Sequence, residues 1–161
     1  MWSLNKMHQV GELIAAFAVV ISLIFVGLQI KDNTIATEAA TYQDTVAYDI
    51  EILLNMASTP EMARVFSTFR DDPESLSGDE FLQGQLLLNA TVRHLENLYL
   101  QHEAGMLSDE AWATREPLIR TYVLSPGFER LMSGSTGQNY GGSFIDYAER
   151  IRSESKGGAG N

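Results

Sequence analysis

Residues 13–30, LIAAFAVVISLIFVGLQI, are the stretch that decides the fold of this chain. The stretch contains eighteen residues without a charge and lies between Glu12 and Lys31. At about 1.5 Å per residue, a helix of this length reaches roughly 27 Å, close to the thickness of the hydrocarbon core of a bilayer. We therefore expect a single transmembrane helix within an N-terminal anchor of residues 1–31.

Two other kinds of segment share this apolar composition. A buried helix of a soluble domain can be apolar all round, but it is rarely this long. A secretory signal peptide has a shorter apolar core, of about 7–15 residues, with a small-x-small cleavage site close behind it. The first such site, Thr37-Glu38-Ala39, lies well beyond the apolar run. The sequence therefore favours a span that is retained.

The predicted span has two different faces. One face carries small and polar residues at helical spacing: Gly11, Ala15, Ala18, Ser22 and Gln29. Larger residues lie opposite: Phe17, Ile21, Ile24 and Leu28. In lipid, helices associate through close backbone approach and interhelical hydrogen bonds, which small residues and glutamine permit. We interpret the first group, called here the small-residue face, as a docking face for another transmembrane helix. A lone anchor with Gln29 reaching the headgroups is the alternative.

The remainder of the chain is acidic and free of cysteine. The net charge of −10 is concentrated in residues 32–80, which hold eleven acidic residues against two arginines. Such an acidic body lacks the positively charged surface that binds the phosphates of nucleic acid, so we expect no nucleic-acid partner. Without cysteine the chain has no disulfide, thiolate metal site or cysteine nucleophile. We expect one acidic helical domain at 32–152 and a disordered, Gly-rich tail at 153–161.

Charges beside the span set its expected orientation. Lys6 and the amino terminus lie on one side, and Lys31 alone lies on the other. Positive residues near a span favour the cytoplasmic side, and the acidic residues 32–80 are unfavourable beside an anionic cytoplasmic leaflet. Together these charges favour a short cytoplasmic N-terminus and an exported body, and the reverse orientation stays open.

Residues 32–152 predict an all-α fold, a small irregular helical bundle that follows the transmembrane helix. No stretch alternates polar and apolar residues with a period of two. Capping residues followed by proline or acidic residues mark four helix starts: Thr59-Pro60, Ser77-Gly78-Asp79, Ser108-Asp109 and Ser125-Pro126. The most apolar segment, 78–104, is the predicted central helix, and Gly105 ends it. Pro117 is expected to kink or interrupt the helix that follows Ser108.

The segment after the span predicts an amphipathic helix that can continue the anchor as one rod. Asn33-Thr34 is the only plausible break between the two. Its apolar residues recur at steps of three and four: Ile35, Ala39, Tyr42, Val46, Ile50 and Leu53.

Candidate chemistry in this sequence is sparse. A ferritin-like metal site needs Glu-x-x-His pairs, and none of the three histidines has a glutamate three residues before it. We expect His102 at the edge of the core and Glu96 on a solvated face of the central helix. The Gly-rich stretch 134–142 lacks the Lys-Ser/Thr ending of a phosphate-binding loop. We therefore predict no catalytic residue, no metal ligand and no cofactor, and we do not expect an enzyme.

Four pieces of the chain resemble, in the same order, a group of single-span bacterial membrane proteins with no assigned activity. The pieces are ISLIFVGLQIKDNT at 21–34, DPESL at 72–76, ENLYLQH at 96–102 and SPGF at 125–128. In that group an SL-apolar-LQI-basic-x-N stretch closes an N-terminal membrane helix. The resemblance covers most of residues 11–130, and the stretch after Gly134 departs from it. It implies a bacterial origin, a membrane anchor and a helical body, and it transfers no site residue.

These observations predict an interaction protein of the bacterial inner membrane. We expect a single-pass accessory subunit that packs against the bilayer and the transmembrane helices of a larger complex, with its body on the periplasmic side. The alternative is a membrane-tethered sensor or small-molecule binding module with a pocket beside Tyr99, His102 and Trp112.

Overall fold

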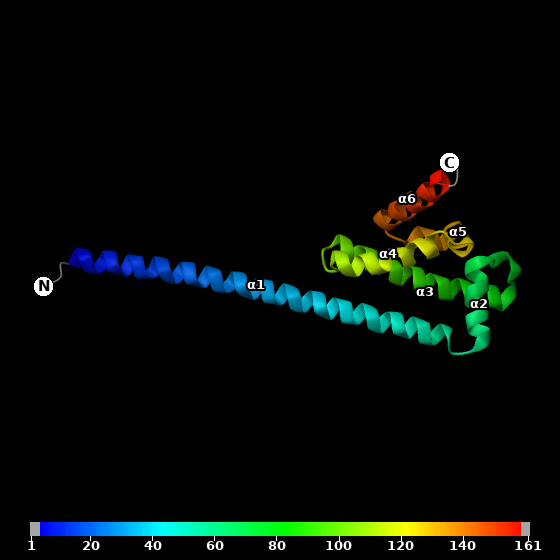
Figure 1. The fold of residues 1–161 in the computed structure, drawn as a ribbon, viewed down its shortest axis with the longest axis horizontal. Coiled ribbons are helices and arrows are strands. Elements are labelled where there is room, and N and C mark those ends of the chain that lie inside the picture. The colour runs from blue at the N-terminus through cyan, green and yellow to red at the C-terminus, as the bar shows by residue number, and fades with distance from the viewer. Residues whose placement is uncertain (1–3, 159–161) are drawn as a thin grey trace. The chain divides into compact units, whose positions relative to one another are not determined.

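The computed structural model describes residues 4–158, and all regular structure in this range is helical (Figure 1). In chain order the α-helices are α1 (Leu4–Met56), α2 (Pro60–Asp71), α3 (Gly78–Glu103), α4 (Asp109–Val123), α5 (Pro126–Met132) and α6 (Gly142–Gly158). Two short 3₁₀ helices, η1 (Pro73–Ser75) and η2 (Ser135–Asn139), join them. The predicted all-α fold is confirmed.

The chain forms two compact units, Met1–Ala40 and Thr41–Asn161, and helix α1 contributes to both. Helix α1 therefore continues without a break past residue 31, the expected end of the anchor. Asn33 and Thr34 do not break the helix. Thr34 Oγ1 donates to the Ile30 carbonyl at 3.0 Å, so its hydroxyl is satisfied within the helix.

Helix α6 also extends further than expected. A disordered tail was predicted from Ser153, but α6 continues through this residue to Gly158. The last three residues of the predicted tail lie outside the described residues.

Hydroxyl caps begin three helices at the predicted positions. Thr59 Oγ1 accepts a hydrogen bond from the Met62 N–H at 3.1 Å, and Ser125 Oγ accepts one from the Phe128 N–H at 3.2 Å. Ser108 caps α4 in the same way. At the end of α3, Gly105 adopts a φ of +69°, a left-handed conformation that glycine enters without strain. Local sequence signals therefore set these helix boundaries.

Pro117 does not interrupt α4, which runs unbroken from Asp109 to Val123. Proline removes the N–H that would otherwise bond to the carbonyl of Ala113. Both Ala113 and Pro117 are exposed, so water can satisfy the freed carbonyl.

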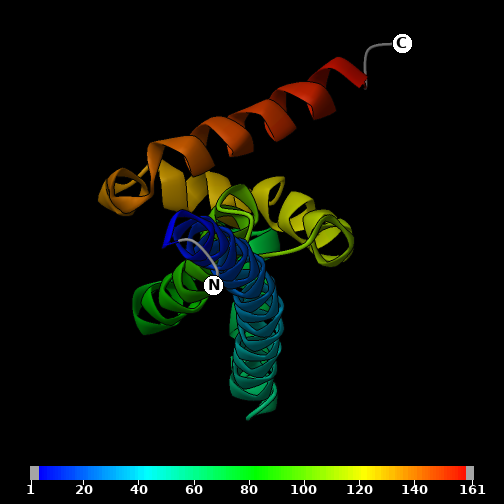
Figure 2. The same ribbon diagram turned by 90° about the vertical axis from the view of Figure 1, so that its left-hand side faces the viewer.

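Helices α2 to α6 bury one hydrophobic core, and Figure 2 shows α6 running along α4 and α5. Its largest fully buried side chains are Phe69, Phe144, Leu88, Leu95, Leu98, Ile119, Leu131 and Ile151. The start of α5 approaches α2 so closely that a Cβ on Gly127 would collide with the carbonyl oxygen of Phe69. The packing of α5 on α2 therefore requires glycine at this position.

The last part of α1, residues 41–56, belongs to the second unit and turns a face of polar and apolar residues toward it, including the half-buried Ile52 and Met56. Thr45 is only 3% exposed, and Asp49 is half-buried. Part of the predicted apolar stripe points outward instead, since Tyr42 is 48% exposed and Ile50 is 51% exposed. We call Tyr42, Ile50 and Leu54 the outer apolar face of α1.

Candidate functional site

The residues of the small-residue face all lie on α1 with their side chains exposed: Gly11, Ala15, Ala18, Ser22 and Gln29. At Gly11, an added Cβ would meet no atom within 4 Å. Their spacing places these residues along one side of the helix. Within the structure, this side is free to accept another helix.

The helix that carries this face is long and apolar enough to cross a membrane, by length and composition. None of its most apolar eighteen-residue window is buried. The large side chains there are strongly exposed, as shown by Phe17 at 66% and Leu23 at 66%. A core helix of a soluble domain would instead bury most of such side chains.

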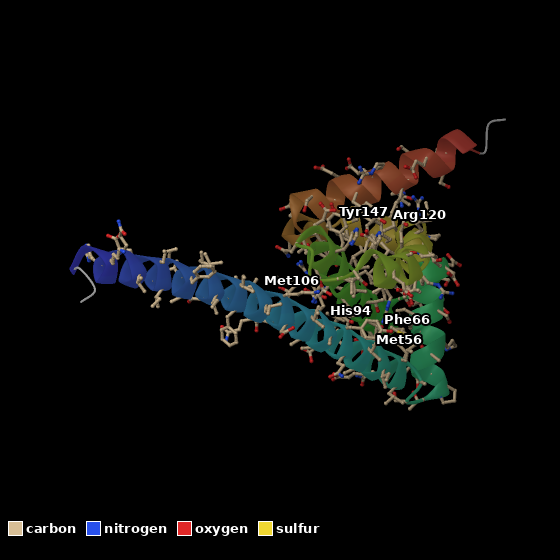
Figure 3. All side chains as sticks on the ribbon, turned by 60° about the vertical axis from the view of Figure 1, so that its left-hand side comes forward. Met56, Phe66, His94, Met106, Arg120 and Tyr147 are labelled. Atoms are coloured by element: carbon tan, nitrogen blue, oxygen red, sulfur yellow. The ribbon has the colours of Figure 1, made fainter. Side chains whose placement is uncertain are left out.

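A cluster of three charged or titratable residues joins the last part of α1 to α3 and α4. Asp49 Oδ1 lies 2.8 Å from Nε2 of His94, and Asp49 Oδ2 accepts a hydrogen bond from the Arg115 guanidinium. Figure 3 shows His94 on the side of α3 near the end of α1. The His94 side chain is 5% exposed and that of Arg115 is 15% exposed, so the cluster is largely shielded from water.

Burial favours the neutral form of His94 in this cluster. Desolvation lowers the pKa of His94 below its ordinary value, which favours the neutral ring. Arg115 balances the charge of Asp49, so the carboxylate does not need a proton on His94. A neutral His94 then donates its Nε2–H to Asp49, and the Tyr48 ring packs beside it with centroids 4.8 Å apart.

Two cavities flank His94. One of about 390 Å³ has polar walls contributed by α1 and α3. The other, of about 250 Å³, is mainly apolar and includes Ile52, Leu53, Leu95 and Leu118 in its lining. The last part of α1 is therefore held to the body by hydrogen bonds across an incompletely filled interface.

Glu96 differs from its prediction, because it is buried and not solvated. It is 7% exposed, and its Oε1 accepts the Gly141 N–H at 2.6 Å. Its Oε2 accepts a hydrogen bond from Arg93 at 2.8 Å. Burial raises the pKa of nearby Tyr140 to about 12, so its phenol stays neutral and donates to Asn89 Oδ1 at 2.6 Å. These contacts fasten the Gly-rich segment to α3 and serve structure.

The residues considered for a pocket near the end of α3 pack on one another instead. His102 stacks on Trp112 with ring centroids 4.5 Å apart and planes within 1°. Tyr99 lies 6.2 Å from Trp112 and 4.7 Å from Tyr147, again between ring centroids. This aromatic cluster closes the junction of α3, α4 and α6, and neither cavity beside His94 extends into it.

Across residues 4–158, no three histidine, aspartate or glutamate side chains come together as a metal site would require. The Asp49–His94–Arg115 cluster holds only two such residues, and the carboxylate is already paired. Its geometry fits a polar link between helices.

Comparison with known proteins gives no further assignment. No protein-family model, no curated protein and no solved structure matches this chain. Its function must therefore be argued from its own residues.

Sequence reasoning did not identify the Asp49 cluster. Asp49 was treated as one of many acidic residues, and Arg115 carried no motif. The only available signal was the spacing of Asp49, which lies one helical turn after Thr45 and one helical turn before Ile52. These three residues share the side of α1 that faces inward in the structure.

Proposed function

We propose that this protein is a non-enzymatic, single-pass membrane protein that acts as an accessory, stabilising subunit of a larger bacterial membrane complex. The observation that carries the proposal is the exposed face of α1. Small residues lie on it within residues 11–29, and the large apolar side chains of the same segment are exposed as well. Proteins rarely leave such extended apolar surfaces open, so these surfaces indicate interaction sites.

The spacing along α1 supports a helical partner. Gly11, Ala15, Ala18, Ser22 and Gln29 follow one another at steps of four, three, four and seven residues, which places them along one side of the helix. Small residues on one side allow a second helix to approach closely.

A co-purification experiment tests this proposal. The tagged, full-length protein is extracted in a gentle detergent, and the proteins that travel with it are identified by mass spectrometry. Replacing Ala18 and Ser22 together by leucine should block close helix approach and release the partners. Ala16→Leu adds leucine bulk at one position on another side of the helix and serves as the control.

The outcomes separate docking from simple anchoring. The proposal requires stoichiometric partners that stay with the wild type and with Ala16→Leu and are lost from the double variant. If the partners still co-purify with the double variant, or are lost equally from the double variant and from Ala16→Leu, a role for the small-residue face is contradicted.

The expected orientation is part of the proposal. The positive charges around the span favour a periplasmic body. Protease added to the periplasmic side of intact spheroplasts should then digest the body, and a fully protected body would reverse the assignment.

A second function, a membrane-tethered sensor or small-molecule binding module, is favoured by the polar cavity beside His94. It is compatible with an accessory role, because the cavity and the exposed face use different residues.

A further inference from the structure

The second cavity beside His94, of about 250 Å³, lies between the last part of α1 and helices α3 and α4. Its lining residues all belong to the second unit, and Figure 3 labels two of them, Met56 on α1 and His94 on α3. All three helices contribute apolar side chains to the lining: Ile52, Leu53 and Met56 from α1, Leu95 from α3 and Leu118 from α4. The cavity is therefore an unfilled, mainly apolar space in the attachment of α1 to the body.

The polar side chains in the lining are engaged within the protein. The Asp49 carboxylate pairs with His94 through Oδ1 and with Arg115 through Oδ2. The Thr91 hydroxyl donates to the Leu87 carbonyl of its own helix at 3.0 Å. Burial lowers the pKa of His94 and favours the neutral ring, so the one carboxylate and the one guanidinium of the lining balance each other. The cavity therefore presents no unpaired charge.

The volume of the cavity limits its occupant to a small molecule. An apolar cavity of about 150 Å³ can hold benzene, whereas drug-sized ligands occupy about 300–1,000 Å³. Leu53 is 63% exposed and Leu118 is 43% exposed, so the cavity opens to the surface beside them. A molecule the size of a single ring therefore fits and has a route of entry.

We propose that this cavity binds a small, neutral, mainly apolar molecule. Such a molecule covers the apolar walls and displaces poorly ordered water, which gains affinity. A charged molecule would lose its hydration without meeting an unpaired counter-charge, because Asp49 and Arg115 are bound to each other. Burial raises the pKa of Tyr122, so the phenol in the wall is neutral as well. Arg115 has N–H donors besides the one bonded to Asp49, so the molecule can carry a single acceptor oxygen.

Binding at this place has a consequence for α1. Because the walls come from α1 and from the body, a bound molecule contacts both and stabilises the attached state of the helix. The inference deepens the second function, the tethered binding module, and gives it an apolar ligand. It is independent of the accessory role, since no residue of the small-residue face lines the cavity.

Methionine methyl groups report on this site in the full-length protein. Met56 lines the cavity, whereas Met62 and Met106 do not. The protein in detergent, with isotope-labelled methionine methyl groups, is equilibrated with benzene vapour, so that the activity of benzene is equal in all samples whatever enters the micelle. The ring current of bound benzene should shift the Met56 signal in a saturable way and leave the Met62 and Met106 signals in place. Benzoate and benzylammonium are charged probes of similar shape and should not bind.

Two pairs of variants locate the binding. Ile52 is half-buried and lines the cavity, so Ile52→Trp fills it. Ile50→Trp adds the same bulk on the outer apolar face of α1, where Ile50 is 51% exposed. Ile52→Trp should weaken benzene binding about tenfold or more, and Ile50→Trp should bind like the wild type. If circular dichroism shows that Ile52→Trp is unfolded, Leu118→Trp carries the test, with the similarly exposed Leu124→Trp outside the cavity as its control.

A saturable shift of Met56 that neither charged probe produces, and that a cavity variant weakens while its control does not, would establish the site. The absence of a saturable shift, or equal shifts of Met56, Met62 and Met106, would overturn the proposal. Binding of benzoate or benzylammonium as tight as that of benzene, or equal weakening by a cavity variant and its control, would overturn it as well. None of these results depends on whether partner proteins co-purify, so failure of this proposal and failure of the accessory role can be told apart.

Discussion

Helices α2 to α6 form a body that packs differently from the last part of α1. In the body, apolar side chains such as Phe69 and Leu98 are fully buried. In the last part of α1, the inward side chains include Thr45 and Asp49 beside the apolar Ile52 and Met56, while Leu54 is 67% exposed. The body is thus stabilised mainly by hydrophobic burial, whereas the attachment of the end of α1 combines polar contacts with half-buried apolar side chains. The apolar side of α1 is left for another surface.

The difference has an energetic consequence. Full burial of one leucine or phenylalanine side chain contributes about 1.5–3 kcal/mol, and the body buries many such residues. One hydrogen bond to a charged group contributes about 1.5–3 kcal/mol, and the end of α1 relies on a few of these. We expect α1 to detach from the body at a lower free-energy cost than the body needs to unfold.

The largest expected effect is a cavity in the body. Leu98→Ala should lower the free energy of unfolding by about 2–5 kcal/mol, because the fully buried side chain leaves a void. Leu54→Ala, on the outer apolar face, should change it by no more than about 0.5 kcal/mol, because this side chain is 67% exposed. Denaturant unfolding of the full-length protein in detergent measures both. Equal losses of unfolding free energy in the two variants would contradict the distinction between the body and the outer apolar face of α1.

Close packing of the body gives a second test. Gly127→Ala should lower the free energy of unfolding by about 1–3 kcal/mol, because the added methyl group meets the Phe69 carbonyl. Gly142→Ala has open space around it and should be neutral or slightly stabilising. Thermal unfolding followed by circular dichroism compares the two. A Gly127→Ala protein as stable as Gly142→Ala would show that α5 is not held tightly against α2.

The polar attachment of α1 can be weakened without disturbing the core. Asp49→Asn removes the charge that pairs with Arg115 and should favour detachment by about 1–3 kcal/mol. Because the chain has no cysteine, Thr45→Cys provides a single buried thiol as a reporter. Asp49→Asn should then raise its labelling rate about fivefold or more, following the fraction of detached helix.

Glu80→Gln is the matched control for Asp49→Asn. It breaks an exposed ion pair between Glu80 and Arg64, which is worth at most about 1 kcal/mol. The labelling rate of the thiol should not change. A rate that is unaffected by Asp49→Asn would mean that polar contacts do not hold α1 in place.

The smallest expected effect is a dependence on pH. The pKa of His94 is lowered in the folded protein, so the unfolded chain binds a proton more readily. Stability from His94 is therefore fully present above the unfolded pKa of about 6.5 and is lost as the pH falls below it. The melting temperature should fall between about pH 7.5 and about pH 5.5, and less steeply in His94→Gln. Parallel profiles for the two proteins would contradict this assignment.

Local features of this fold could be predicted from the sequence, and the orientation of α1 could not. Thr59 and Ser125 mark helix starts because a cap bonds to a backbone N–H three residues away. Asp49, in contrast, faces inward because of partners 45 and 66 residues further along the chain. Hydrophobic periodicity predicts the apolar stripe of α1. It does not predict which side of α1 forms a hydrogen bond with Arg115, a residue far away in the sequence.

The same limit applies to the candidate sites. The small-residue face could be recognised because all its members lie on one helix at regular spacing. The cavity beside His94 could not, because its walls come from two helices separated in sequence. Glu96 was misjudged for a related reason, since its partner Gly141 lies 45 residues away.

The most direct test of the central claim is the native mass of the protein after gentle extraction from the membrane. The chain itself has a mass of 17.8 kDa. An accessory subunit should elute in a much larger particle that contains partner proteins in fixed stoichiometry. A protein–detergent particle with the mass of one or two chains, and no partner, would contradict the accessory role and leave the tethered binding module as the remaining function.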